Sequence, residues 1–233
     1  MAASARSTPR RRAPSRVSEG AAPAPLVLAT RSAGKIRELT ALFAAEGIAV
    51  ESLEALGLVE EAAEEGIECF DTFEANAEAK ARWFAARLPG RVVFAEDSGL
   101  MVDALDGAPG VHSKRWAQVM ASGRALEEGT NAALLRALEG VQERSARYRC
   151  VAVCIVGPTR WVGAGHVEGR ITLAAEGAGG FGYDPYFESV ELGKTFGMAS
   201  AEEKAGVSHR ARAVRALLVA GGAALRQSVR SRA

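Results

Sequence analysis

The chain has 233 residues, of which 48% are apolar and 24% are charged, a balance that suits a globular protein built around one sizeable α/β domain. Its formal net charge of +1 conceals a contrast, because residues 1–24 contribute +4 and residues 226–233 contribute +3, which leaves −6 on residues 25–225. A mildly acidic body argues against binding to nucleic acid, and association with a membrane is not expected because no apolar stretch approaches the about 20 residues of a membrane span.

Both ends of the chain differ in composition from the rest. Residues 1–24 are rich in Ala, Arg, Ser and Pro and lack apolar periodicity, which predicts a disordered tail. The same composition resembles an organelle transit peptide, and a start codon placed too far upstream would give the same pattern. Residues 228–233 predict a short basic tail, and residues 25–227 predict a single domain. The three cysteines have no CxxC spacing, which favours free thiols and a cytoplasmic location.

Predicted strands and helices alternate in the first half of the domain. Short apolar runs predict buried strands, and apolar residues three or four positions apart predict helices. The expected elements are a strand at 26–30, a helix from 36 to about 47, a strand at 48–53, a loop or short helix at 54–68, and a helix that Asp71 or Thr72 caps and that ends near Leu88. Pro89 and Gly90 then prevent the helix from continuing.

The second half of the domain is richer in predicted strands. The expected elements are a strand at 91–95, an extended segment at 100–105, a turn at 106–110, a helix at 126–138, a hairpin of 148–156 with 160–167, a glycine-rich loop at 177–182, and a helix that Ser208 caps and that ends near Leu225. Strand–helix units combined with a hairpin predict an α/β fold, in which a mixed, twisted sheet is flanked by helices.

The segment from Thr30 to Lys35 connects the first predicted strand to the first predicted helix. A helix N-terminus presents free N–H groups and a positive dipole end, which favour an anion. Lys35 adds a positive charge, and Thr30 and Ser32 add hydroxyl groups. The segment is not a P-loop, because no glycine precedes it at the required offset and Ile36 follows the lysine. We therefore expect a phosphate site here, with an ordinary strand-to-helix turn as the alternative.

Two adjacent carboxylates, Glu96 and Asp97, follow an apolar strand. Buried unpaired charge is costly, so the pair either faces solvent or holds something cationic. Adjacent strand residues point to opposite faces, so one carboxylate can ligate a metal while the other orients water. Lys80 lies four residues after Asn76 on the preceding helix and shares its face. Beside an acidic site, this lysine favours metal-linked phosphate oxygens; a solvated helix face is the alternative.

Two segments nearer the C-terminus carry groups that suit a nucleotide base. Gly179–Pro185 combines glycines, which let the backbone approach a ligand closely, with aromatic rings on which a base can stack. Lys204 and the tripeptide Ser208–Arg210 add hydrogen-bond donors near the start of the last helix. Taken singly, these segments also suit an unusual turn and a solvated helix start.

Together the segments resemble the inosine/xanthosine triphosphate pyrophosphatase family, in the family's order and over nearly all of residues 26–225. The matching motifs are Ala29-Thr-Arg-Ser-Ala-Gly-Lys-Ile-Arg-Glu38, Thr72-Phe-Glu-Ala-Asn-Ala-Glu-Ala-Lys80, Glu96-Asp-Ser-Gly-Leu100, Gly107-Ala-Pro-Gly110, Gly180-Phe-Gly-Tyr-Asp-Pro185 and Ser208-His-Arg210. The resemblance implies an elongated sheet with two lobes and a cleft between them, a homodimer, and Mg²⁺-dependent hydrolysis of ITP, dITP and XTP to the nucleoside monophosphate and pyrophosphate.

The resemblance also implies roles for individual residues. It implies that Asp97 is the catalytic proton acceptor, that Asp97 and Glu68 are metal ligands, and that Ser98 contacts the substrate. The residues implied to bind the triphosphate are Thr30, Arg31, Ser32, Ala33, Gly34, Lys35 and Lys80. The residues implied to form the base pocket are Phe181, Gly182, Tyr183, Asp184, Lys204, His209 and Arg210. Glu64 and Glu65 remain open as alternatives to Glu68.

Several positions depart from the family's pattern. Arg31 and Ser32 stand where a glycine and an asparagine are usual, so Arg31 must either point away from the triphosphate or add charge to its site. Glu96 replaces the more common aspartate, and Phe70 replaces a glycine, which weakens the assignment of the nearby metal ligand. Two rival interpretations stay open: a pyrophosphatase for other modified triphosphates, such as pyrimidines, and a nucleotide-binding protein without turnover.

Overall fold

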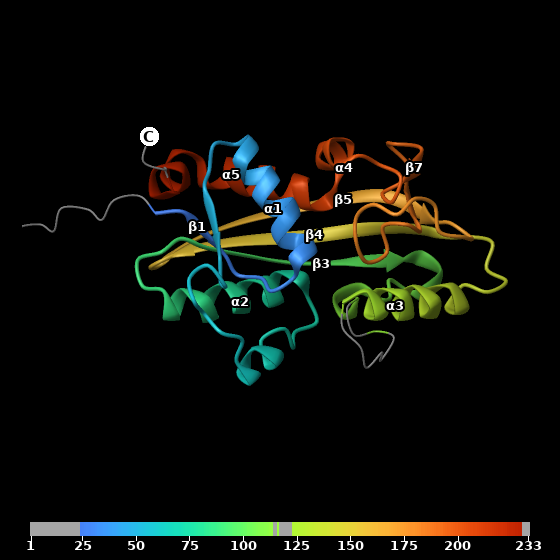
Figure 1. The fold of residues 1–233 in the computed structure, drawn as a ribbon, viewed down its shortest axis with the longest axis horizontal. Coiled ribbons are helices and arrows are strands. Elements are labelled where there is room, and N and C mark those ends of the chain that lie inside the picture. The colour runs from blue at the N-terminus through green and yellow to red at the C-terminus, as the bar shows by residue number, and fades with distance from the viewer. Residues whose placement is uncertain (1–23, 114–115, 117–122, 230–233) are drawn as a thin grey trace, which may run out of the picture.

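The computed structural model describes residues 24–113, 116 and 123–229, and these form one open seven-stranded sheet in the order β2-β1-β3-β4-β5-β6-β7 (Figure 1). The strands are β1 (Leu26–Leu28), β2 (Val50–Ser52), β3 (Val93–Val102), β4 (Ser145–Val156), β5 (Thr159–Ile171), β6 (Phe187–Ser189) and β7 (Lys194–Thr195). The tails predicted at 1–24 and 228–233 lie almost entirely outside the described residues.

The sheet is mixed, as the alternation of elements predicts. β1 pairs in parallel with both β2 and β3, whereas every neighbouring pair from β3 onward is antiparallel. β3, β4 and β5 are the long strands and run along much of the molecule (Figure 1). Glu96 and Asp97 pair with Ala152 and Val151 of β4. The two carboxylates therefore lie within a central strand, not at its end.

Five helices cover the two faces of the sheet in the described part of the chain: α1 (Ala33–Ala45), α2 (Phe73–Arg87), α3 (Gly123–Ala137), α4 (Ala201–Val207) and α5 (His209–Val229). α1, α4 and α5 lie on one side of the sheet, and α2 and α3 lie on the other (Figure 1). α5 packs directly on β5, because a Cβ added at Gly163 or Gly165 would come within 2.4 Å of the backbone of α5. This contact brings the start of α5 close to the middle of the sheet.

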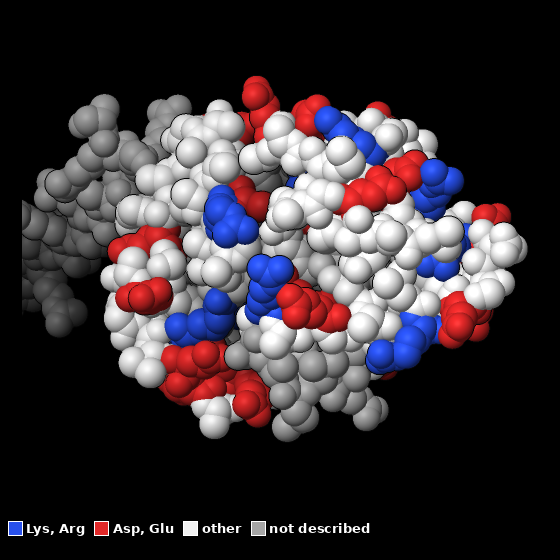
Figure 2. Space-filling model, turned by 45° about the vertical axis from the view of Figure 1, so that its right-hand side comes forward, with Lys and Arg blue, Asp and Glu red and all other residues white. Residues whose placement is uncertain are grey.

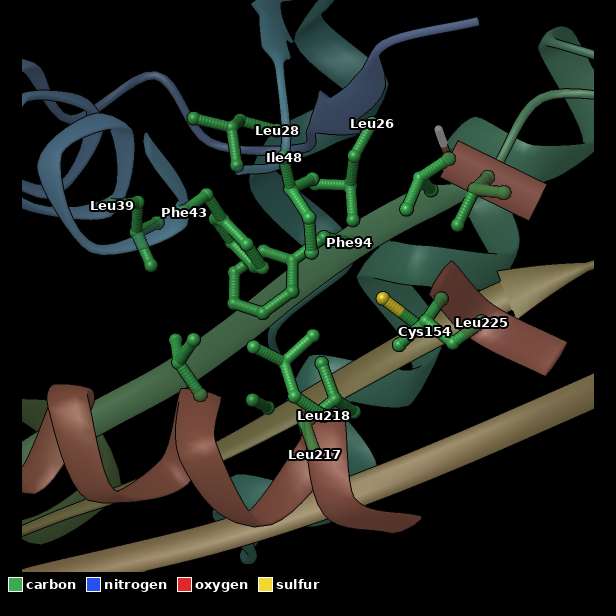
Figure 3. Close-up of a cluster of buried hydrophobic side chains, with 14 of the residues drawn as sticks. Leu26, Leu28, Leu39, Phe43, Ile48, Phe94, Cys154, Leu217, Leu218 and Leu225 are labelled. Atoms are coloured by element: carbon green, nitrogen blue, oxygen red, sulfur yellow. The ribbon is translucent and has the colours of Figure 1, made fainter. Parts of the chain in front are cut away.

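Each face of the sheet has its own hydrophobic core. Leu39 and Phe43 of α1 meet Leu217 and Leu218 of α5 over Phe94 of β3 (Figure 3). The rings of Phe43 and Phe94 pack edge to face with centroids 5.1 Å apart, a geometry that aromatic pairs favour. A second cluster lies beneath α2 and a third beneath α3. The starts of α1, α2 and α5 are thereby fixed relative to the centre of β3.

Most predicted elements are confirmed, one open choice is decided, and there are two differences. Thr72 caps α2, because its side chain accepts a hydrogen bond from the backbone N–H of Ala75. The extended segments predicted at 91–95 and 100–105 form one strand, β3, whose polar residues are buried against partners. α4, β6 and β7 have no counterpart among the predicted elements. The two lobes and the cleft between them stay a prediction.

Charged groups of both signs are mixed on the surface. On the face drawn in Figure 2, groups of Lys and Arg lie next to groups of Asp and Glu. Within the described ranges, no helix is both long enough and apolar enough to cross a membrane.

Candidate functional site

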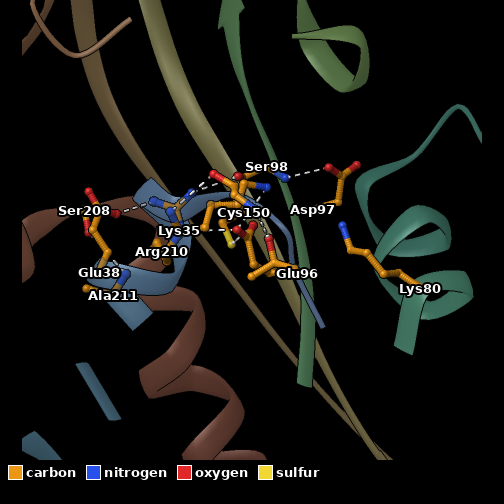
Figure 4. Close-up of polar contacts among 12 residues, drawn as sticks. Lys35, Glu38, Lys80, Glu96, Asp97, Ser98, Cys150, Ser208, Arg210 and Ala211 are labelled. Carbon is orange, nitrogen blue, oxygen red and sulfur yellow. Dashed lines mark hydrogen bonds and ion pairs between the residues drawn. The ribbon is translucent and has the colours of Figure 1, made fainter. Parts of the chain in front are cut away.

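The two carboxylates of β3 point in different directions, as the alternation of a strand predicts. Glu96 faces Lys35 and Arg210 (Figure 4): Lys35 Nζ lies 3.0 Å and Arg210 Nε lies 3.2 Å from Glu96 Oε1, and the Glu96 side chain is 0% exposed. Burial alone would raise the pKa of Glu96, but the two cations outweigh burial and hold this pKa well below its usual value. Glu96 is therefore an ionised carboxylate that the protein neutralises internally.

Asp97 points toward α2 and Lys80 (Figure 4). Asn76 Nδ2 donates to Asp97 Oδ2 at 3.0 Å, and the backbone N–H of Ser98 donates to Oδ1 at 2.9 Å. Asn76 is itself fixed, because its amide bonds the N–H and the C=O of Phe70 at 2.9 and 3.1 Å. Burial raises the pKa of Asp97, although two nearby lysines oppose this effect. A rigidly held carboxylate with a raised pKa suits the role of proton acceptor.

Glu68 reaches the same region from the loop that precedes α2. It forms an ion pair with Lys80, and both residues act electrostatically on Asp97. Burial would raise the pKa of Glu68, but Lys80 and Lys35 lower it below its usual value. Among the residues that the structure describes, no group of three or more His, Cys, Asp or Glu side chains is placed to hold a metal. Two carboxylates and two lysines therefore gather here, from β3, α1, α2 and the loop.

The turn from β1 to α1 lies beside these groups. Ser32 caps α1 by accepting a hydrogen bond from the backbone N–H of Lys35 at 3.4 Å, and Thr30 Oγ1 accepts one from the N–H of Ser32 at 3.2 Å. Ala33 and Gly34 form the start of the helix, and no acidic residue lies in its first turn. The geometry is that of a helix N-terminus suited to an anion; substrate contact by this turn stays a prediction.

Arg31 differs from its neighbours in this turn, because its side chain contacts another loop. Its Nη2 lies 2.7 Å from Glu64 Oε1, and its Nη1 donates to the carbonyl of Leu58 at 2.6 Å. Of the two outcomes that the sequence leaves open for this arginine, the structure therefore favours a side chain that points away from the triphosphate. Arg31 also pairs with Glu64, which is one of the two alternatives to Glu68 as a metal ligand.

Lys204 and Arg210 come together around Glu38, a residue of α1. Lys204 Nζ lies 2.6 Å from Glu38 Oε1 and also pairs with Asp184, and Arg210 pairs with the second oxygen of Glu38. Arg210 Nη2 donates to Ser98 Oγ at 3.1 Å. Burial would raise the pKa of Glu38, but the charges of Arg210 and Lys204 lower it. The structure thus brings together four residues predicted to contact the base or the rest of the substrate.

The ring of Phe181 lies over the start of α1. A Cβ added to Gly34 would come within 2.6 Å of the ring, so only a glycine permits this contact without a shift. Lys204 Nζ lies 5.1 Å and Arg210 Cζ lies 5.5 Å from the ring centroid, within the range of cation–π attraction. The backbone N–H of Phe181 donates to Asp184 Oδ2 at 2.7 Å. Phe181 therefore links the predicted phosphate site to the predicted base site.

His209 is buried at the start of α5. It stacks on Tyr148 with ring centroids 4.6 Å apart and 10° between the ring planes. Burial and the charges of Arg210 and Lys204 hold the pKa of His209 well below its usual value, so its imidazole is neutral. Within the described part of the chain, its Nδ1 has no hydrogen-bond partner.

Tyr183 and Gly182 tie the glycine-rich loop to its neighbours. The Tyr183 hydroxyl donates to the carbonyl of Ser113 at 3.0 Å, and the carbonyl of Gly182 accepts a hydrogen bond from Asn131 of α3 at 3.0 Å. These polar atoms are thereby used within the fold. Contact of the two residues with a base stays a prediction.

Glu38 has no role among the predicted site residues, although it bridges two of them. A single glutamate on an amphipathic helix is typical of a solvated face. The sequence pattern that could have identified Glu38 is its position three residues after Lys35, because this spacing puts both side chains on one face of α1. Cys150 is buried with a free thiol, as the cysteine spacing predicts, and this thiol donates to Glu96 Oε2 at 3.4 Å.

Comparisons of the sequence and of the structure with known proteins point to the same family. The model of the Ham1 family matches residues 26–220. The chain is 46% identical to a dITP/XTP pyrophosphatase of Geobacillus kaustophilus, over 81% of this chain and 90% of the relative, and 44% identical to one of Geobacter sulfurreducens, over 81% and 92%. Among solved structures, the Staphylococcus aureus Ham1 protein is similar with a TM-score of 0.68 at 32% identity, covering 84% of this chain and 96% of that one.

Proposed function

The chain belongs to the Ham1 family, and from that premise and the site geometry we propose that it hydrolyses the non-standard purine nucleoside triphosphates dITP, ITP and XTP to the nucleoside monophosphate and pyrophosphate. One observation carries the proposal: lysines of two separate helices meet the carboxylates of β3 and of the loop before α2. Lys35 pairs with Glu96, Lys80 pairs with Glu68, and Asp97 points toward Lys80 (Figure 4). A metal-bound polyphosphate needs both kinds of charge at one site, because carboxylates bind the metal ion and lysines bind the phosphate oxygens.

The triphosphate would lie at the start of α1, between the two lysines. The first turn of α1 offers free N–H groups, and its cap residue, Ser32, uses its side chain within the turn. Lys35 is buried against Glu96, and Lys80 pairs with Glu68. Both lysines are therefore held at fixed positions before substrate arrives, which favours electrostatic stabilisation without rearrangement.

A Mg²⁺ ion fits the donor set at this position. Mg²⁺ is usually bound by one or two carboxylates together with substrate phosphates, and it does not need a complete cage of protein ligands. Glu68 and Asp97 are the residues that would hold it, since the two are electrostatically coupled and lie beside Lys80. When bound, Mg²⁺ supplies neutralisation of negative charge on the phosphate oxygens.

The proposed reaction is attack of water on the α-phosphorus. An oxygen–phosphorus bond forms at the α-phosphorus, the bond to the bridging oxygen breaks, and pyrophosphate leaves. Asp97 orients the water and accepts its proton, because its carboxylate has a raised pKa and its oxygens are positioned by Asn76 and by the N–H of Ser98. Lys35 and Lys80 stabilise the charge that develops on the phosphate groups.

Selectivity for the base follows from the donors of Lys204 and Arg210. An ammonium group has three N–H donors and a guanidinium has five, and neither accepts. Lys204 uses two partners and Arg210 uses three within the described residues, so each has donors left for a keto oxygen. Adenine presents an amino donor at the corresponding position. An unmade buried hydrogen bond costs about 1–3 kcal/mol, so each such contact disfavours adenine by about one to two decades.

A panel of triphosphates tests the proposal. We expect pyrophosphate release from dITP and XTP in Mg²⁺, little release from dATP, and none in EDTA. Equal hydrolysis of dATP would exclude the donor pocket. Preference for a modified pyrimidine triphosphate would favour the first rival, and binding of dITP without release would favour a protein without turnover.

Replacement of Asp97 tests the chemical step separately. Asp97→Asn keeps the shape of the side chain but removes the proton acceptor, and we expect kcat to fall by about 10²–10³-fold. The protein should remain folded with a lowered thermal unfolding midpoint, because the Asn oxygen can still accept the N–H of Ser98 while its NH₂ group faces the Asn76 donor and that hydrogen bond is lost. Wild-type kcat in a folded Asp97→Asn protein would refute the role of Asp97.

A further inference from the structure

Arg31 uses all three of its guanidinium nitrogens inside the protein. Nε and Nη2 donate to the two oxygens of Glu64 at 3.1 and 2.7 Å, and Nη1 donates to the carbonyl of Leu58 at 2.6 Å. The paired contact with both carboxylate oxygens is the geometry that makes an arginine–glutamate pair strong and directional. Because Arg31 belongs to the β1–α1 turn, this pair joins the predicted phosphate site to the loop before α2.

Besides the Arg31 pair, this loop is attached by a contact of 3.4 Å between Arg87 of α2 and Glu61, and Leu58 packs against the hydrophobic cluster beneath α2. From Val59 to Gly66, Glu64 is the only residue that is not exposed. A cavity of about 320 Å³ lies beside Arg31 and is lined by residues of the β1–α1 turn and of the segment 52–60. Glu64 Oε1 also accepts a hydrogen bond from the backbone N–H of Glu61 at 3.2 Å, which makes Glu64 the point at which the loop folds on itself.

The loop leads directly to Glu68. Glu64 lies within a 3-10 helix at Ala62–Gly66, Ile67 is buried directly after this helix, and Glu68 then pairs with Lys80. A displacement of the segment 58–66 is therefore transmitted over a few residues to the carboxylate beside Asp97.

We propose that Arg31 is a positioning residue, which fastens the segment 58–68 to the β1–α1 turn and thereby holds Glu68 in place for the metal-linked triphosphate. The inference rests on the proposed function for its catalytic consequence. It assigns Arg31 no contact with phosphate, because a phosphate contact would require the arginine to leave Glu64 and the loop to lose its attachment. Arg31 acts on the reaction through Glu64.

Two measurements on the wild type, four principal variants and Arg31→Lys test this role. The variants are Arg31→Ala, Glu64→Gln, the double variant, and Arg82→Ala as the matched control, which removes an arginine–glutamate pair of α2 without touching the loop. Hydrogen exchange is followed for the peptide 58–70, whose hydrogen-bonded amides include those of Glu64 and Ile67, in the absence of nucleotide and metal. Steady-state kinetics with dITP then give kcat, KM and the Mg²⁺ concentration for half-maximal rate.

We expect Arg31→Ala to speed exchange in the peptide 58–70 by about fivefold, a change typical of losing one partly exposed ion pair. The Mg²⁺ concentration for half-maximal rate should rise by a similar factor, and the double variant should be no worse than either single variant, because the two residues act as one unit. Arg82→Ala should leave both measurements unchanged. Arg31→Lys should restore only part of the effect, because lysine cannot make the paired contact.

Two results would overturn the inference. The first is unchanged exchange of the peptide 58–70 in Arg31→Ala, and this measurement decides the matter even if the wild type releases no pyrophosphate. The second is a higher KM for dITP in Arg31→Ala that persists in the Glu64→Gln background with no change in the Mg²⁺ requirement, because this would mean that Arg31 binds the triphosphate directly.

Discussion

Removing the charge of Lys204 tests whether the stability of the protein depends on equal numbers of positive and negative side chains in the predicted base pocket. Three cations, Lys35, Lys204 and Arg210, face three carboxylates, Glu38, Glu96 and Asp184, through the ion pairs described above. Lys204 is only 6% exposed. Loss of one partner of a buried pair costs about 3–5 kcal/mol, so Lys204→Met should lower the unfolding midpoint by roughly 6–20 °C in a domain of this size.

The loss of stability in Lys204→Met should be larger at high pH than at low pH. Burial raises the pKa of Asp184, and Lys204 opposes this effect, so the pKa rises further in Lys204→Met. A carboxyl with a raised folded-state pKa destabilises the protein above that pKa, and the penalty disappears as the pH falls through it. Thermal unfolding should therefore show a smaller difference between Lys204→Met and the wild type at pH 5 than at pH 8.

A second variant separates lost charge balance from lost packing. Lys204→Met/Asp184→Asn neutralises the carboxylate that the first change leaves unpaired, while an Asn oxygen can still accept the N–H of Phe181. The double variant should regain most of the stability. A Lys204→Met protein as stable as the wild type, or a double variant less stable than the single one, would refute the reasoning.

Three further predictions follow from single contacts. Asn76→Ala removes a donor to Asp97 and should lower kcat by about a hundredfold, because the Asp97 carboxylate is then misplaced. The control Thr72→Ala removes only the helix cap, so it should cost about 1 kcal/mol of stability with little change in kcat. Equal kcat in both variants would contradict this prediction. Gly34→Ala should raise the KM for dITP, because its Cβ would displace the ring of Phe181, and an unchanged KM would count against that contact. A thiol reagent should label Cys69 alone in the native protein, since Cys150 and Cys154 are buried and burial raises their pKa; native labelling of a second cysteine would exclude this packing.

The fold was predictable where local signals are strong. The periodicity of α1, the cap of α2 by Thr72 and the apolar runs of the sheet are confirmed, as is the family resemblance. β3 was expected as two pieces because Glu96-Asp-Ser98 interrupts its apolar run, and its burial depends on cations from α1 and α5 that no local pattern reveals. α4 was missed although Ser200 and Glu203 form a capping box, since a seven-residue helix has too little periodicity to detect.

The candidate site was predictable in its residue types but not in its internal pairing. Lys35 stands out because it lies at a strand-to-helix junction, Lys80 because it shares a helix face with Asn76, and Asp97 because a carboxylate that follows an apolar run needs a partner. The neutralisation of Glu96 by Lys35 and Arg210 depends on α5 crossing the sheet beside α1, which is a tertiary feature. Glu38 was missed for the same reason, because its two partners are more than 160 residues away in sequence.

The central claim is that water attacks the α-phosphorus of the bound triphosphate. Hydrolysis of dITP in H₂¹⁸O, with the products analysed by mass spectrometry, tests it most directly. We predict that the nucleoside monophosphate carries the ¹⁸O label and that the released pyrophosphate carries none. Label in the pyrophosphate, or products that are the diphosphate and inorganic phosphate, would contradict the account.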